Sequence, residues 1–224
     1  MCKLTEEGLS NVRTADPLVC TYGFLDFKCS IKEDIENIEG CGICSACLDR
    51  LCSPLCPEGR FDSKFAMVFR NPLSVDTPYT GYMRADCDFG QVFQLYLKIL
   101  GIAKTELYMT GALFCPVPDD RIPTIEENRL CGCVYKEKEI SRLNNVRIIF
   151  LMGEDALKQF IDPKLNIRDH WSDTYYIASD PSVYLLPIFH VGTYLNNVEE
   201  QRNILKHLLI LRKRFVEPVK RGEL

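Results

Sequence analysis

Residues 146–156, with the sequence VRIIFLMGEDA, decide the fold class of this chain. Their first part is an almost unbroken apolar run, which predicts a strand buried on both faces of a sheet. The glycine and the two acidic residues that follow predict an immediate helix start. Because a parallel neighbour is reached only through a crossover, a buried strand that leads straight into a helix favours an α/β fold.

Further strands and helices alternate on both sides of this run. Short apolar runs predict the strands, and apolar residues at helical spacing predict the helices. The strands are expected at 64–72, 107–114, 175–178 and 184–190, and the helices at 89–100, 124–143 and 198–215. The alternation predicts an α/β three-layer sandwich whose central sheet is mainly parallel.

Length and composition fit one globular domain with small additions. The chain has 224 residues, 46% hydrophobic and 26% charged, which is enough to bury a sizeable core. We expect an N-terminal extension over 1–40, one domain over 41–216 and a C-terminal tail over 217–224. Since no run approaches the roughly 20 apolar residues of a membrane span and the start lacks a signal-peptide core, we expect a cytoplasmic protein, inside the host cell if it is viral, with no membrane partner.

The charge pattern leaves nucleic acid open as a partner. The formal net charge is −4, yet a local basic groove can hold DNA on an acidic protein. A cluster of basic residues near the end of the chain predicts either a solvated helix face or a contact with a DNA backbone. Its members are Lys206, His207, Arg212, Lys213, Arg214, Lys220 and Arg221.

Four of the twelve cysteines have the spacing of metal ligands. Cys44 and Cys47 form a C-x-x-C pair, and Cys115 and Cys131 form a second pair with fifteen residues between them. Two separated pairs can share one metal centre if the fold closes the gap, and four thiolates suit either an iron-sulfur cluster or zinc. Other cysteines stand close enough to compete as ligands, namely Cys41, Cys52, Cys56 and Cys133.

Candidate site residues lie at the ends of the predicted strands. In open parallel sheets, ligands bind beyond the carboxyl ends of the strands. Asn71 and Pro72 end the first strand, residues 111–115 end the second, and His190 ends the last. We therefore expect these positions to converge in one cleft.

Together these motifs resemble a known family. The C-x-x-C, the strand that ends in a proline turn, the segment 115–131 (CPVPDDRIPTIEENRLC) and the later VRIIFLMG and PIFHVGTYL are similar to the iron-sulfur uracil-DNA glycosylases of family 4. The resemblance covers about residues 41–215. It implies a uracil-DNA glycosylase-like fold, DNA as the ligand, and a 4Fe-4S cluster held by Cys44, Cys47, Cys115 and Cys131, with zinc as the alternative.

The same resemblance implies roles for residues after the strands. Asn71 falls on the position that orients the attacking water in related branches of the superfamily, and His190 matches the histidine that donates to the departing pyrimidine. Tyr82, with Tyr79 as the second choice, is expected to stack on a flipped base. From its residue type alone, Arg70 is either a phosphate contact or a surface arginine.

Several positions depart from the family pattern. Arg70 replaces the glutamate of the first-strand loop, Gly111 replaces the base-reading asparagine, and Val191 replaces the proline after the histidine. Phe114 replaces a lysine beside the third cysteine. Without the asparagine amide at position 111, the hydrogen bonds to the edge of the base are lost, and with them about 1–3 kcal/mol of base discrimination.

Two functions fit these observations. The first, which the combined losses favour, is a DNA-binding iron-sulfur protein with weak or lost base excision that acts as an accessory module in DNA replication or repair, beside a protein partner. The second is an active DNA glycosylase of altered base specificity that uses Asn71 and His190. A zinc protein unrelated to DNA is a remoter alternative.

Overall fold

The computed structural model describes most of the predicted domain. The described residues are 12–15, 42, 55, 57–71, 83, 85–117, 121–131, 137–177 and 180–224. Among the residues singled out from the sequence, Cys44, Cys47, Pro72, Tyr79 and Tyr82 lie outside these ranges, as do the competing cysteines Cys41, Cys52, Cys56 and Cys133.

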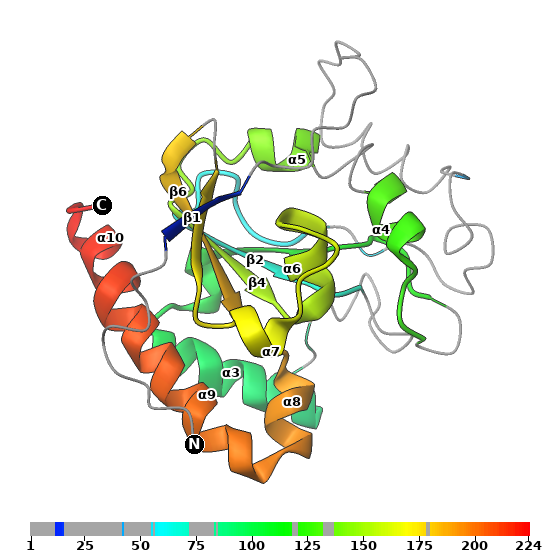
Figure 1. The fold of residues 1–224 in the computed structure, drawn as a ribbon. Coiled ribbons are helices and arrows are strands. Elements are labelled where there is room, and N and C mark those ends of the chain that lie inside the picture. The colour runs from blue at the N-terminus through cyan, green and yellow to red at the C-terminus, as the bar shows by residue number, and fades with distance from the viewer. Residues whose placement is uncertain are drawn as a thin grey trace.

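A six-stranded sheet forms the centre of the molecule (Figure 1). Its strands are β1 (Val12–Ala15), β2 (Phe65–Phe69), β3 (Leu107–Gly111), β4 (Ile148–Met152), β5 (Thr174–Ile177) and β6 (Asp180–Ile188), in the spatial order β1-β5-β6-β4-β2-β3. All neighbouring pairs are parallel except β5 and β6, which are antiparallel. The expected α/β fold with a mainly parallel central sheet is confirmed.

The three strands β2, β3 and β4 are buried at every position. Helices cover both faces of a sheet of this kind, so the inner strands β2 and β4 need apolar side chains on both faces, and this explains their continuous apolar runs. Phe65, Phe69 and Phe150 are among the large side chains with almost no exposed surface. The core therefore lies around β4 and β2, the strands that the sequence identifies most clearly.

Helices lie on both faces of the sheet (Figure 1). On one face α3, α8 and α9 pack against one another, and on the other α6 packs on β4 and α4 packs on α6. The helices are α3 (Asp88–Leu100), η2 (Lys104–Glu106), α4 (Ile125–Cys131), α5 (Glu137–Ser141), α6 (Glu154–Phe160), α7 (Ile167–His170), α8 (Val191–Asn196), α9 (Val198–Leu211), η5 (Arg212–Val216) and α10 (Glu217–Arg221). In the described part of the chain, no helix is both long and apolar enough to cross a membrane.

Helix boundaries agree with the sequence where a strong end signal is present. The helix expected over 89–100 is α3, and Gly101 ends it in the left-handed conformation at φ 72°. The helix expected over 124–143 is instead two helices, α4 and α5. Gly132 follows α4 in the sequence, and glycine disfavours a helix interior.

Both ends of the chain contribute to the fold more than the sequence indicates. β1 comes from the expected N-terminal extension and pairs in parallel with β5. At the other end, α9 continues through the wider turn η5 into α10, where Val219 is buried. The sheet and its helical cover therefore recruit short segments from the regions expected to be an extension and a tail.

Candidate functional site

The carboxyl ends of four strands meet at one edge of the sheet. Phe69, at the end of β2, pairs with Gly111 at the end of β3. Met152, at the end of β4, pairs with Ile188 near the end of β6. Gly111 is the last residue of β3, and the chain segments that follow the four strands carry Arg70, Asn71, Cys115, Asp155 and His190, so the candidate residues lie at this edge.

Backbone hydrogen bonds hold these strand ends together. The N–H of Ala112 donates to the carbonyl of Phe69 at 2.7 Å, and the N–H of Leu113 donates to that of Arg70 at 3.1 Å. The strand expected over 107–114 thus leaves regular pairing after Gly111 but stays attached to the end of β2. The segment before Cys115 is therefore fixed beside the Arg70 loop.

Arg70 is the hub of the polar contacts at this edge. Its Nε donates to Asn71 Oδ1 at 2.6 Å and lies 3.7 Å from the Asp155 carboxylate. Its Nη2 donates to the backbone carbonyl of Arg121, in the segment between Cys115 and Cys131. One guanidinium therefore connects the ends of β2 and β4 with the loop that carries the second cysteine pair.

Asp155 is not among the residues that the family motifs point to. It lies in the first turn of α6, just after β4, and only 15% of its side chain is exposed. Burial raises the pKa of its carboxyl, and the nearby Arg70 guanidinium opposes part of that rise. The rule that ligands bind after parallel strands is the signal that could have identified it, because Asp155 follows the clearest strand of the sequence.

His190 is held as a neutral imidazole with a defined tautomer. It caps the start of α8, where the N–H of Gly192 donates to its Nδ1 at 3.1 Å. Since Nδ1 accepts, the proton of the neutral ring must be on Nε2. Burial, with a smaller effect of the Arg70 charge, lowers the pKa of His190 to about 4, so the ring is neutral at pH 7.

Gly153 allows the end of β4 to approach this histidine closely. Its φ is +90°, and a Cβ built on it would lie 3.2 Å from Cβ of His190. A side chain at this position would be strained by the backbone and crowded by the ring. The glycine of the strand-Gly-helix motif therefore serves the packing between β4 and the histidine loop.

Gly111 lies at the same edge, buried at the end of β3. A glycine offers only its backbone groups, so this position cannot read a base edge with a side-chain amide. Asn71 is also buried, at 6% exposure, and its amide oxygen accepts from Arg70. The stacking candidates Tyr82 and Tyr79 lie outside the described residues.

Two of the four cysteines expected to bind a metal, Cys115 and Cys131, are described, and both lie near the residues at the strand ends. Cys115 is buried, and Cys131 packs against Leu113 and Val117, which flank Cys115 on both sides. Leu55 lies at the same place, because its N–H donates to the carbonyl of Phe114 at 2.8 Å. The described residues by themselves contain no group of three or more potential metal ligands, and Cys44 and Cys47 lie outside them.

A buried ion pair fixes the segment between these cysteines. Both carboxylate oxygens of Glu127, which is 2% exposed, accept from Arg121 at 2.6 and 2.9 Å. Thr124 completes a capping box at the start of α4: its N–H donates to the Glu127 carboxylate at 2.7 Å, and its hydroxyl accepts from the Glu127 N–H at 3.1 Å. The helix start expected at Thr124 is confirmed.

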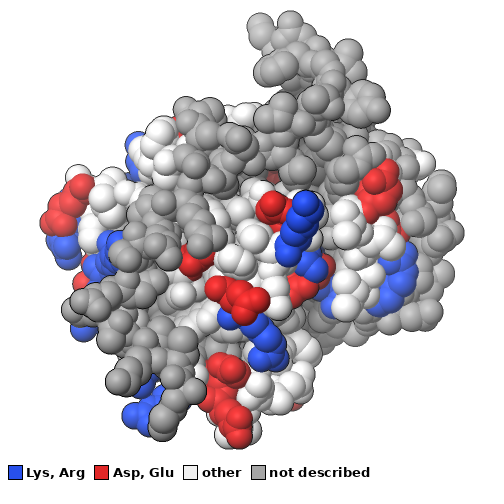
Figure 2. All heavy atoms as spheres, in the orientation of Figure 1, with Lys and Arg blue, Asp and Glu red and all other residues white. Residues whose placement is uncertain are grey.

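Three of the six lysines and arginines in the basic cluster near the end of the chain have acidic partners. Arg212 pairs with Glu217, Lys220 with Glu106 and Arg221 with Glu223, while His207 is buried. On the face shown in Figure 2, the described basic side chains also alternate with acidic ones. These observations favour a solvated helix face over a DNA-binding surface.

Comparisons with known proteins agree with this geometry. No protein-family model matches the chain. The chain is 28% identical over 194 residues to a protein named type-4 uracil-DNA glycosylase from Thermotoga maritima, an alignment that covers 81% of this chain and 92% of that protein. The resemblance expected from the sequence motifs is thereby confirmed: along most of its length, this chain is similar to a type-4 uracil-DNA glycosylase.

Proposed function

We propose that this chain is a DNA-binding protein of uracil-DNA glycosylase-like fold whose base excision is weak or lost, and that it acts as an accessory module in DNA replication or repair. The similarity to a type-4 uracil-DNA glycosylase supports DNA as its ligand. The gathering of polar residues at the carboxyl ends of the parallel strands supports a ligand site at that edge.

The position of Arg70 is the main observation in favour of reduced base excision. Hydrolysis of a glycosidic bond proceeds through an oxocarbenium-like transition state, in which positive charge develops on the sugar. A carboxylate near that sugar stabilises the charge, whereas a guanidinium destabilises it. Arg70 stands where the family has a glutamate, and Asp155 compensates its charge only from 3.7 Å away.

Asn71 cannot act as a general base in place of the family's glutamate. Its amide can orient a water molecule but cannot take a proton from it. The Arg70 Nε already donates to its Oδ1 at 2.6 Å, which leaves this oxygen less available for a water molecule. With glycine at position 111, side-chain recognition of a pyrimidine edge is also reduced.

One observation favours a second candidate, an active DNA glycosylase of altered specificity. His190 is neutral with its proton on Nε2, so it can donate a hydrogen bond to a departing base anion without giving up a proton. In this mechanism Asn71 positions the water, and the half-buried Asp155 carboxylate stabilises the positive sugar. Tyr82 is the proposed stacking partner of the flipped base.

For the cofactor, we propose a 4Fe-4S cluster held by Cys44, Cys47, Cys115 and Cys131. The described half of this set fits, because Cys131 packs beside the segment of Cys115 and the Leu55 N–H donates to the carbonyl of Phe114. The cluster would crosslink these segments near the ligand edge, a structural role. Zinc accepts the same thiolates, so anaerobic purification followed by iron and sulfide analysis decides between them.

A strand-cleavage assay tests the function. Oligonucleotides that carry uracil, mismatched bases or modified pyrimidines are incubated with the protein and treated with alkali, and DNA binding is measured on the same samples. We expect binding with little or no cleavage. Cleavage that disappears in both Asn71→Ala and His190→Ala, but persists in the surface control Gln94→Ala, would instead establish the active glycosylase.

A further inference from the structure

The strand-end edge holds a buried carboxylate that the family motifs do not assign, that of Asp155. It shares this edge with Arg70 and Asn71, which follow β2, and with His190, which follows β6. Among the described residues that directly follow the four strands, only Glu154 and Asp155 are acidic. Hydrolysis of a glycosidic bond is commonly assisted by a carboxylate that activates water, so these two side chains are the candidates for that role.

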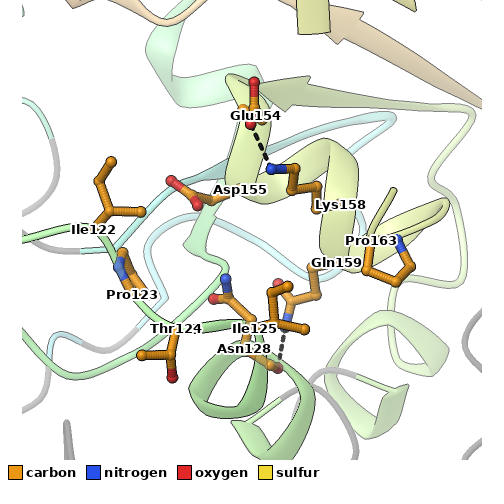
Figure 3. A pocket seen from close by; sticks show the side chains of 10 residues that line it. All are labelled: Ile122, Pro123, Thr124, Ile125, Asn128, Glu154, Asp155, Lys158, Gln159 and Pro163. Carbon is orange, nitrogen blue, oxygen red and sulfur yellow. Dashed lines mark hydrogen bonds and ion pairs between the residues drawn. The ribbon is translucent and has the colours of Figure 1, made fainter. Parts of the chain in front are cut away.

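The two carboxylates differ in their surroundings. Glu154 pairs with Lys158 at 2.5 Å, and 42% of its side chain is exposed. Asp155 is 15% exposed and lines a pocket of ≈ 560 Å³. Figure 3 shows its carboxylate projecting from α6 toward Ile122 and Pro123, away from the pair of Glu154 and Lys158. Asp155 is therefore the acidic group that faces both this open space and the strand-end residues.

The Asp155 carboxylate lies close to the point where a glutamate at position 70 would place its own. Arginine and glutamate share the same side-chain stem as far as Cδ, and the next atom is Nε in arginine and a carboxylate oxygen in glutamate. In the same rotamer, that oxygen would lie at the position of Arg70 Nε, which is 3.7 Å from Asp155 Oδ2. Asp155 thus brings a carboxylate to this region from β4, the strand next to β2.

The Arg70 charge weakens this carboxylate as a base. Burial raises the pKa of the Asp155 carboxyl, the Arg70 and Lys158 charges lower it, and Glu154 adds a small rise. A carboxylate with a higher pKa takes a proton from water more readily. Removal of Arg70 would therefore leave a more basic carboxylate at the same place.

We propose that Asp155 is the carboxylate through which this chain can still hydrolyse a glycosidic bond, and that Arg70 suppresses it. The inference rests on the proposed function, because it takes DNA as the ligand and weak excision as the starting point. It assigns the suppressed chemistry to a residue of α6 and not to the loop after β2.

The step that Asp155 assists is a hydrolysis. Water forms the new bond to C1′ of the sugar and gives a proton to the Asp155 carboxylate. The bond between C1′ and the base nitrogen breaks, and its electron pair leaves with the base, whose anion accepts a hydrogen bond from Nε2 of His190. The proton then passes through solvent to the base, so that an abasic sugar and a free base result.

Single-turnover excision of uracil from an oligonucleotide by the full-length protein tests the proposal. Arg70→Ala should excise uracil about tenfold or more faster than the wild type, and the addition of Asp155→Asn should remove that gain. Glu154→Gln in the same background is the matched control, because it removes the neighbouring carboxylate of α6, and it should keep the gain. The proposal is overturned if the Arg70→Ala, Asp155→Asn protein is as fast as Arg70→Ala, or if Arg70→Ala is no faster than the wild type.

Folding and DNA binding are measured on each protein by urea unfolding and fluorescence anisotropy. Asparagine has nearly the shape of aspartate, so both should match those of Arg70→Ala alone. Asp155→Ser in the same background is the second substitution if the asparagine variant does not fold. Retention of the gain in a folded Asp155→Ser protein would equally overturn the proposal.

The outcomes also separate this inference from the proposed function. If the wild type excises uracil rapidly, the proposed function fails, and Asp155→Asn and Glu154→Gln made singly decide the role of Asp155. If the wild type binds DNA and excises weakly, but the gain in Arg70→Ala is absent or insensitive to Asp155→Asn, only this inference fails.

Discussion

At the scale of single residues, two histidines have environments that exclude the charged form. His190 is held by the Gly192 N–H at the start of α8, and His207 is buried in α9 with the Trp171 ring edge-on at 4.6 Å. Burial lowers the pKa of His190 to about 4 and that of His207 to about 3. Both rings resist protonation in the folded state and take a proton readily once the chain unfolds.

These two pKa values predict acid destabilisation in a defined window. In the unfolded chain both histidines titrate near 6.5, so between pH 6.5 and about 4 the unfolded state binds more protons. The free energy of unfolding should therefore fall as the pH falls, by about 1.4 kcal/mol per pH unit for each histidine. Urea unfolding between pH 7 and 4.5 measures this slope, and His207→Leu should make it shallower. A flat profile would contradict the buried neutral state.

In the function proposed above, Arg70 is the residue that reduces base excision. Replacing it with alanine removes the positive charge from the proposed site and removes the hydrogen bond to the Asn71 oxygen. We expect Arg70→Ala to raise excision of uracil about tenfold or more over the wild type. Arg70→Lys keeps the charge and should remain as slow as the wild type. Equal activity of all three proteins would show that the guanidinium does not limit catalysis.

At the scale of elements, the central strands carry most of the core. Each residue of β4 is buried, and the strand pairs in parallel with both β2 and β6. Its apolar run is visible in the sequence because both faces of the strand are covered by helices. By contrast, β1 is a four-residue strand at the sheet edge, with no comparable pattern.

Truncation in β4 should be far more costly than truncation at the surface. Phe150 has no exposed surface, so Phe150→Ala is expected to lower the free energy of unfolding by about 3–5 kcal/mol. Ile125→Ala, at 63% exposure, should change it by no more than about 0.5 kcal/mol. Denaturant unfolding of both variants gives the comparison. Similar small losses would show that β4 is not the centre of the core.

At the scale of the whole molecule, the basic C-terminal segment and the candidate site lie at opposite ends of β2. Lys64 Nζ donates to the carbonyl of Val219, and Lys220 Nζ lies 5.9 Å from the centre of the Phe65 ring. Phe65 begins β2, whereas Arg70 follows its end. α10 is therefore at the amino edge of the sheet, away from the proposed DNA site.

This arrangement predicts that the terminal basic residues contribute little to DNA binding. We expect the double variant Lys220→Ala, Arg221→Ala to change DNA affinity by less than about twofold and to leave its salt dependence unchanged. Fluorescence anisotropy with a labelled oligonucleotide at several salt concentrations measures both. A salt slope reduced by about one or two ions would place the DNA backbone at α10 instead.

Local patterns along the chain were sufficient for the mainly parallel α/β fold, the strands β2 and β4, the helix α3 and the capped start of α4. Apolar periodicity, a glycine at a helix end and a capping box involve residues that are close in the sequence, so they can be recognised from the sequence alone. The rule for parallel strands also anticipated that Asn71 and His190 would lie at one edge.

Long-range packing established the rest. The contact of Arg70 with Asp155 and the addition of β1 to the sheet join segments that are distant along the chain. Charge compensation and burial depend on which side chains the fold brings within a few ångströms. The chemical effect of an arginine at position 70 therefore depends on its contacts with Asn71 and Asp155.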